Sequence, residues 1–175
     1  VCRDLLEAEA STLFLADEEG KWLTFHTAKG GAEEALLTIP PLRVGEGIAG
    51  WVAQNRRSVN VGDVAQDERF AERVDRELDF RTESILAAPL VAGSVLVGVI
   101  EAINKRGEEG FGAEDEVLLG LLAEQAALAI ESARDSEQRR HDDRLAVVGQ
   151  MASSIIHDIK NPMAVIQGYA HLLAK

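Results

Sequence analysis

A long helical pattern in the last third of the sequence constrains the fold most. From Ala113 to Lys175 no proline interrupts this pattern until Pro162. If the helix is continuous, it is about 90 Å long at the usual rise per residue. A rod of that length is too long to belong to one small domain. The sequence therefore predicts that the helix leaves a globular domain and packs elsewhere.

The rod has three parts that differ in composition. Residues 117–133 carry a broad apolar face, which predicts packing on the preceding domain or on a twin helix. Residues 134–144 are eleven polar residues without glycine or proline, which predicts a solvated helical connector. From residue 145 a heptad seam predicts a helical bundle and a homodimer through the exit helix and this seam. The seam consists of Leu145, Val148, Ala152, Ile155, Ile159, Pro162, Ile166, Tyr169 and Leu173.

An earlier apolar seam in the rod does not continue in the same heptad frame. The phase slips across the polar connector, and such a slip can transmit rotation or strain along a helix. This earlier seam comprises Leu119, Leu122, Ala126, Ala129 and Ala133.

The first 112 residues show the alternation and turn residues of an antiparallel sheet. The segment 84–105 is the clearest signal, with two apolar runs around a Gly93-Ser94 turn, and Gly98 indicates a bulge or a close backbone approach. The other predicted elements are a helix over 1–9, strands over 11–17 and 21–27, a helix and strand within 44–61, and a loop with a weak helix over 67–80.

Charge and cysteine content limit the partners and the compartment. The net charge is -12, and the first 134 residues carry all of it, with 25 acids and 13 bases. Such a domain would be repelled by nucleic acid and by anionic lipid, so we expect neither nucleic-acid binding nor direct membrane contact. The single cysteine, Cys2, fits a reducing, cytoplasmic location. The sequence starts without methionine, and we expect it to be a piece of a longer protein.

His157 is the candidate reactive residue of the heptad region. With Ile155 and Ile159 in the seam, His157 falls on the opposite face, toward solvent; Asp158 is adjacent and Asn161 lies one turn further. A neutral imidazole oriented by a carboxylate can attack a phosphoryl group. A metal site is disfavoured, because one histidine and one aspartate are half a ligand set. A surface histidine without a role remains the alternative.

The stretch MASSIIHDIKNPMAVIQGYAHLL, residues 151–173, resembles the H-box of the dimerisation and phosphotransfer domain (HisKA, or DHp) of sensor histidine kinases. The resemblance implies that His157 is the phosphoacceptor and that Asp158 is an acid/base that fixes its tautomer. It implies that Asn161 orients water during phosphatase activity and that Pro162 bends the helix. ATP would be bound by a catalytic domain that this chain lacks.

Residues 1–133 resemble a GAF domain, on the stretches RVGEGIAGWVAQNRRSVNVGDVAQDERF and LAAPLV with VLVGVIEAINK. The resemblance implies an α+β fold, with an antiparallel sheet of five or six strands and flanking helices. Its small-molecule ligand is not assigned by the sequence, and a cyclic nucleotide is one candidate. Covalent bilin and haem are disfavoured by the positions of Cys2 and His26, and a metal centre lacks ligand clusters.

Five residues near the end of this domain resemble the N-K…F…D-E motif of cyclic-nucleotide-responsive GAF domains. We expect an ion pair between Lys105 and Asp115 to clamp the last strand to the exit helix, with Phe111 packed beneath. Such a clamp would stabilise the fold with or without a ligand. The motif comprises Asn104, Lys105, Phe111, Asp115 and Glu116.

The sequence as a whole predicts a GAF sensor (1–133), a polar helical connector (134–144) and the first, truncated helix of a phosphotransfer domain (145–175). The leading hypothesis is the sensory portion of a two-component histidine kinase, in which a ligand signal reaches His157 and phosphate passes to an aspartate of a response regulator. The full-length protein would be an enzyme, and this piece would be inactive alone. The alternative is a GAF receptor for a cyclic nucleotide or another metabolite, whose trailing coiled coil only dimerises.

Overall fold

The computed structural model describes residues 2–29, 39–70, 75, 80–107 and 110–140. The chain divides into two units, Val1–Glu131 and Ser132–Lys175, and each is considered by itself. In the second unit, residues 132–140 are helical and exposed. The predicted heptad seam and His157, Asp158, Asn161 and Pro162 lie outside the described residues.

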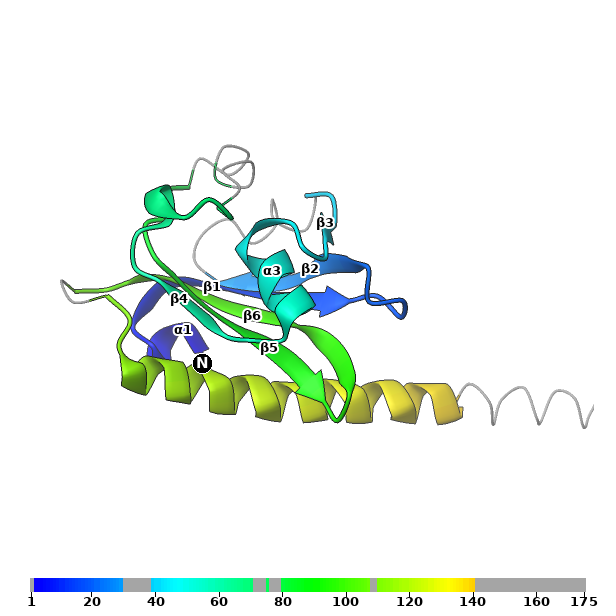
Figure 1. The fold of residues 1–175 in the computed structure, drawn as a ribbon. Helices are drawn as coiled ribbons and strands as arrows, with labels where there is room; N and C mark the ends of the chain where they lie inside the picture. The colour runs from blue at the N-terminus through cyan, green and yellow to red at the C-terminus, as the bar shows by residue number, and fades with distance from the viewer. Residues whose placement is uncertain (1, 30–38, 71–74, 76–79, 108–109, 141–175) are drawn as a thin grey trace, which may run out of the picture. The chain divides into compact units, whose positions relative to one another are not determined.

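The first unit is built on a six-stranded antiparallel sheet in the order β3-β2-β1-β6-β5-β4 (Figure 1). The predicted α+β class and strand number are therefore confirmed. A helix over residues 113–140, here called the exit helix, follows the last strand. The other elements are α1 Cys2–Leu5, β1 Ala8–Ala16, β2 Trp22–Lys29, β3 Leu42–Arg43, α3 Gly47–Asn55, β4 Val59–Val61, the 3-10 helix η1 Val64–Gln66, β5 Ile85–Ala92 and β6 Val95–Lys105.

Apolar side chains cover both faces of the sheet. The face under α3, here called the α3 face, has a core that includes Phe14, Phe25, Val52 and Val99. The opposite face packs on the exit helix and includes Leu86, Leu119 and Ala123. Figure 1 shows α3 and the start of the exit helix on opposite sides of the sheet. The sheet is thus the middle layer between α3 and the exit helix.

The predicted N-terminal helix is too long. The sequence suggested a helix through Glu9, but α1 ends at Leu5 and β1 begins at Ala8. Ala8 is fully buried and lies opposite Lys105 on β6. Pairing with the central strand therefore overrides the weak helical spacing of these residues.

The hairpin of β5 and β6 is confirmed, including both of its glycines. Gly93 has a φ of +60° in the turn, a conformation that glycine adopts without strain. At Gly98 a Cβ atom would lie 2.0 Å from the carbonyl oxygen of Phe14 on β1. The register between the two strands of the hairpin shifts between Leu90 and Val91, next to Gly98. Only glycine allows β1 and β6 to approach this closely.

The exit helix uses one stripe to cover the sheet and leaves a second apolar stripe exposed. Leu119 of the predicted upstream seam is fully buried against its own sheet. The large apolar side chains that the helix exposes are Val117, Leu121 and Leu128. Ala129 and Ala133 of the predicted seam are also exposed. No helix among the described residues is both long and apolar enough to cross a bilayer.

Candidate ligand site and its junction with the exit helix

A buried polar pair interrupts the apolar α3 face. Glu101 on β6 lies directly opposite Thr12 on β1, and the two residues are only 6% and 5% exposed. On the other side of β6, Ala87 of β5 lies opposite Glu101. Along β6 the side chains on the same face are those of Val99 and Ile103, both of which join the core of the α3 face. Glu101 is thus a carboxylic acid on the central strand, surrounded by small and apolar side chains.

Burial changes the acidity of this carboxyl group. Desolvation raises the pKa of Glu101 from its ordinary value near 4.5 to about 7. No cationic side chain among the described residues pairs with it, and neither Thr12 nor Ala87 carries a charge. An isolated carboxylate is costly to bury, so Glu101 tends to keep its proton. It could act as a hydrogen-bond donor when protonated and as an acceptor when ionised.

A separate polar contact ties α3 to the segment that follows η1. The guanidinium of Arg69 lies 4.6 Å from the ring centroid of Trp51 on α3. Its Nε donates a hydrogen bond of 2.8 Å to Oδ1 of Asp67. This hydrogen bond holds the pKa of Asp67 below its ordinary value. The contact fixes one wall of the α3 side of the domain.

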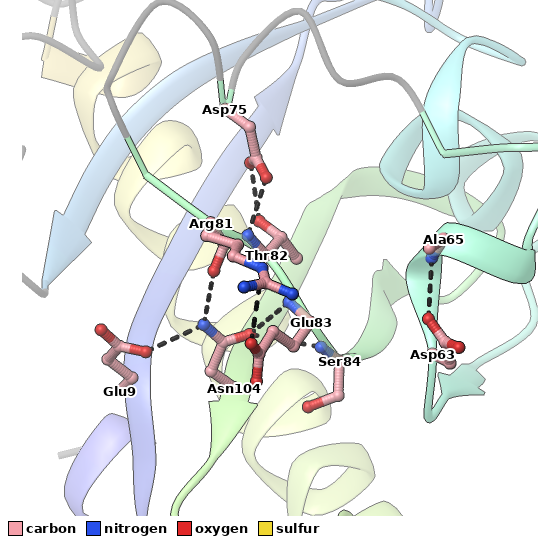
Figure 2. A network of polar contacts seen from close by, with 9 residues as sticks. All are labelled: Glu9, Asp63, Ala65, Asp75, Arg81, Thr82, Glu83, Ser84 and Asn104. Atoms are coloured by element: carbon pink, nitrogen blue, oxygen red, sulfur yellow. Dashed lines mark hydrogen bonds and ion pairs between the residues drawn. The ribbon is translucent and has the colours of Figure 1, made fainter.

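Asn104 connects the segment before β5 to the two central strands (Figure 2). Its Oδ1 accepts hydrogen bonds from the backbone N–H groups of Glu83 (2.7 Å) and Ser84 (3.2 Å). Its Nδ2 donates to the Arg81 carbonyl (2.8 Å) and to Glu9 Oε2 on β1 (2.8 Å). The side-chain amide of Asn104 thus accepts two hydrogen bonds and donates two, all within the protein. Its role is therefore structural: it holds the segment before β5 against β1 and β6.

Asp75 also holds the segment before β5 through hydrogen bonds to Thr82. The carboxylate of Asp75 accepts hydrogen bonds of 2.7 Å from both the backbone N–H and the hydroxyl of Thr82. Figure 2 shows the contact of Asp75 with Thr82 beside the contacts of Asn104 with the same segment. Residues 81–84 are therefore held at two points, by Asp75 and by Asn104.

Lys105 links β6 to the exit helix. Its Nζ lies 3.0 Å from Oδ1 of Asp115 and donates a second hydrogen bond, also of 3.0 Å, to the carbonyl of Leu6. Asp115 Oδ2 in turn accepts from the Gly112 backbone N–H at 2.9 Å. Both charged side chains are 16% exposed, so water screens this ion pair only partly. The structure thus brings together the two residues that the sequence pointed to as a clamp.

A second anchor of the exit helix was not anticipated. Asn60 Nδ2, on the edge strand β4, donates to the carbonyl of Phe111 (2.8 Å) and to Glu116 Oε1 (3.0 Å). Phe111 itself is buried in the core against the exit helix. The contacts of Lys105, Phe111, Asp115 and Glu116 therefore lie at the start of this helix. Asn104, the fifth motif residue, instead contacts the segment before β5 and Glu9.

Other chemistries find little support in the described residues. These contain no group of three or more His, Cys, Asp or Glu side chains that could hold a metal ion. His26 is exposed. Burial raises the pKa of the Cys2 thiol to about 11, which leaves little reactive thiolate at neutral pH.

Replacing Lys105 by alanine should lower the free energy of unfolding by about 2 kcal/mol, because Asp115 and the Leu6 carbonyl lose a partly buried partner. Urea denaturation of the chain measures this. Lys21→Ala is the matched control, since the Lys21–Glu19 pair is mostly exposed and should contribute little. Equal effects of the two substitutions would contradict a special role for the clamp.

Comparison with known proteins agrees with this architecture. The GAF domain family matches residues 1–130. The dual 3',5'-cyclic-AMP and -GMP phosphodiesterase 11A of Takifugu rubripes is 25% identical over 177 residues, covering 95% of this chain and 20% of that protein. The chain thus spans about a fifth of this relative's length.

Two solved structures share the fold. The GAF domain of a phosphoenolpyruvate-protein phosphotransferase from Coxiella burnetii has a TM-score of 0.68 and 23% identity, covering 77% of this chain and 78% of that one. A domain of a candidate two-component sensor histidine kinase from Sinorhizobium meliloti 1021 has a TM-score of 0.62 and 19% identity, covering 79% and 90%.

The fold and the sites define an α+β domain in which a six-stranded antiparallel sheet separates a core that contains a buried acid from an anchored exit helix. More specifically, the chain belongs to the GAF domain family.

Proposed function

We propose that this chain is the sensory portion of a two-component histidine kinase. A small molecule binds on the α3 face of the GAF domain, and the exit helix relays the signal to His157. In the full-length protein, His157 is phosphorylated from ATP by a catalytic domain outside this chain. It then passes the phosphate to an aspartate of a response regulator, and two copies associate through the helical region.

The observation that carries this proposal is that one strand, β6, contributes both to the α3 face and to the attachment of the exit helix. β6 presents Glu101 on the α3 face and, four residues later, uses Lys105 to hold Asp115 of the exit helix. A shift of β6 on ligand binding would therefore act directly on the first turn of the exit helix. The H-box resemblance of residues 151–173 supports a phosphoacceptor as the output.

A receptor without kinase output is the second candidate. Its support is the 25% identity to a relative whose name, dual 3',5'-cyclic-AMP and -GMP phosphodiesterase 11A, gives both cyclic nucleotides as its substrates. In that case cyclic AMP or cyclic GMP is the ligand, and the trailing helices only dimerise.

Melting curves of the purified chain with micromolar cyclic AMP or cyclic GMP test ligand binding. The second candidate predicts a rise of several degrees with a cyclic nucleotide, because a ligand that binds only the folded state stabilises it by mass action. The same curves with 5'-AMP and 5'-GMP control for general nucleotide effects. If all four curves coincide with that of the free protein, a cyclic nucleotide is not the ligand.

A further inference from the structure

Glu101 is a buried acid on the central strand β6, and its place in the core has no structural explanation. No hydrogen bond or ion pair involves it in the described part of the chain. Two other buried polar side chains of this region do have partners: the Thr82 hydroxyl donates to Asp75, and the Ser84 hydroxyl accepts from a backbone N–H. A buried polar group without a partner is rare in folded proteins and calls for a functional reason.

The neighbours of Glu101 are packed as a core. Thr12 and Ala87, which lie directly opposite it on β1 and β5, are buried, and so is Val99 on the same face of β6. The helix α3 packs on both β5 and β6. Such an enclosure does not suit a bulky ligand. A proton, however, can exchange between water and a side chain that keeps an exposed fraction of 6%.

No charged group among the described residues faces Glu101 from the elements around it. The helix α3, the strands β4 and β5 and the 3-10 helix η1 contain no acidic, basic or histidine residue. On β1 the one such residue is Glu9, whose carboxylate accepts from Asn104. On β6 the other charged residue is Lys105, which binds Asp115 of the exit helix.

Charged groups further from Glu101 are engaged elsewhere. Beyond η1, Asp67 binds Arg69, and Asp75 binds the segment before β5. His26 of β2 is exposed. Glu101 without its proton is therefore a lone charge in an apolar core. This desolvation raises the pKa of Glu101 to about 7, so its ionisation falls in the neutral range.

The position of Glu101 along β6 connects the acid to the exit helix. Three residues further on, Asn104 holds Glu9 and the segment before β5, and the next residue, Lys105, holds Asp115. A bare carboxylate in a core is stabilised by contact with water. Water gains that contact when β6 and the elements packed on it move apart. A displacement of β6 would therefore reach these two contacts within four residues.

We propose that Glu101 is a proton sensor that changes the anchoring of the exit helix in the neutral pH range. With its proton the acid is neutral and the core is closed. When the carboxyl group gives this proton to water, the carboxylate becomes hydrated, β6 shifts, and the contacts at the first turn of the exit helix change. This input goes beyond the small-molecule signal of the proposed function and does not depend on it.

NMR spectra of the chain from pH 5.5 to pH 8 test the inference. Two reporters lie at the anchors of the exit helix: the Gly112 backbone N–H, which donates to Asp115, and the Asn60 side-chain amide, which donates to the Phe111 carbonyl. The methyl groups of Leu119, fully buried against the sheet, are a third reporter that does not exchange with water. We expect all three signals to shift with a common midpoint near pH 7. These signals come from the folded state, so a change in global stability alone does not move them.

Glu101→Gln is the decisive variant, because it keeps the shape of the side chain and cannot ionise. Its three reporters should show no midpoint near pH 7, and at pH 8 they should resemble those of the wild type at pH 5.5. All histidines remain in this variant, so it also controls for their titration. Glu124→Gln, at an exposed position of the exit helix, should titrate like the wild type. Melting curves verify that both variants fold.

Two results would overturn the inference: wild-type reporters that stay constant between pH 5.5 and pH 8, or reporters that titrate equally in the wild type and in Glu101→Gln. The first result needs no variant. Either result leaves the proposed kinase output intact. Conversely, a full-length protein that takes up no phosphate from ATP would reject the kinase output and leave the proton response of this domain standing.

Discussion

Replacing Glu101 by glutamine should stabilise the free protein at pH 8 by about 3 kcal/mol and should have almost no effect at pH 4.5. In the folded protein the pKa of Glu101 is about 7, compared with an ordinary value near 4.5. Between these values the folded state holds a proton that the unfolded chain releases. The stability from this proton is fully present below pH 4.5 and is lost as the pH rises through 7. The 3 kcal/mol corresponds to this pKa difference at about 1.4 kcal/mol per unit.

Urea denaturation of both proteins from pH 4.5 to pH 8.5 measures the effect. The readout is the difference between wild type and variant, because every other titrating group changes stability equally in both proteins. Glu124→Gln, at an exposed position, should show no such pH-dependent difference. A constant difference between wild type and Glu101→Gln across this range would contradict the raised pKa.

Replacing His157 by alanine in the full-length protein should abolish incorporation of labelled phosphate from ATP. Alanine has no nucleophilic nitrogen, so the phosphoramidate bond of the proposed intermediate cannot form. Autoradiography after incubation with labelled ATP measures the loss, and the label on the wild type should be removed by mild acid, as expected for phosphohistidine.

His171→Ala is the control for this experiment, since it removes another histidine of the same region. It should retain the label. Undiminished labelling of His157→Ala would reject His157 as the phosphoacceptor, and the receptor without kinase output would then become the better description of the chain.

Much of the fold could be predicted from local signals in the sequence. The Gly93-Ser94 turn between two apolar runs defined the hairpin of β5 and β6, and Gly98 indicated the close approach to Phe14. The error at Ala8 and Glu9 arose because pairing with β6 is a contact across nearly a hundred residues. Such long-range pairing leaves little trace in local helical spacing.

The candidate site was only partly accessible from the sequence. Lys105 and Asp115 were found through a motif, but Glu101 was overlooked because it lies in a continuous apolar run. Both faces of the sheet are covered, so β6 has no clear polar and apolar alternation that would assign Glu101 to one side. A single acid within a long apolar strand was the available signal. Asn60 gave none, since short edge strands often carry polar residues.

The backbone at Asn104 has a consequence for protein engineering. Glu101, Ile103 and Lys105 would share one face of a regular strand, but Asn104 has a φ of +56°, and Lys105 instead reaches the first turn of the exit helix. Asparagine tolerates this left-handed conformation better than branched residues do. A chimera that fuses this GAF domain to a different C-terminal domain should therefore keep residues 104–116 unchanged. The splice can then be made further along the helix, because its rotational setting is determined where it starts.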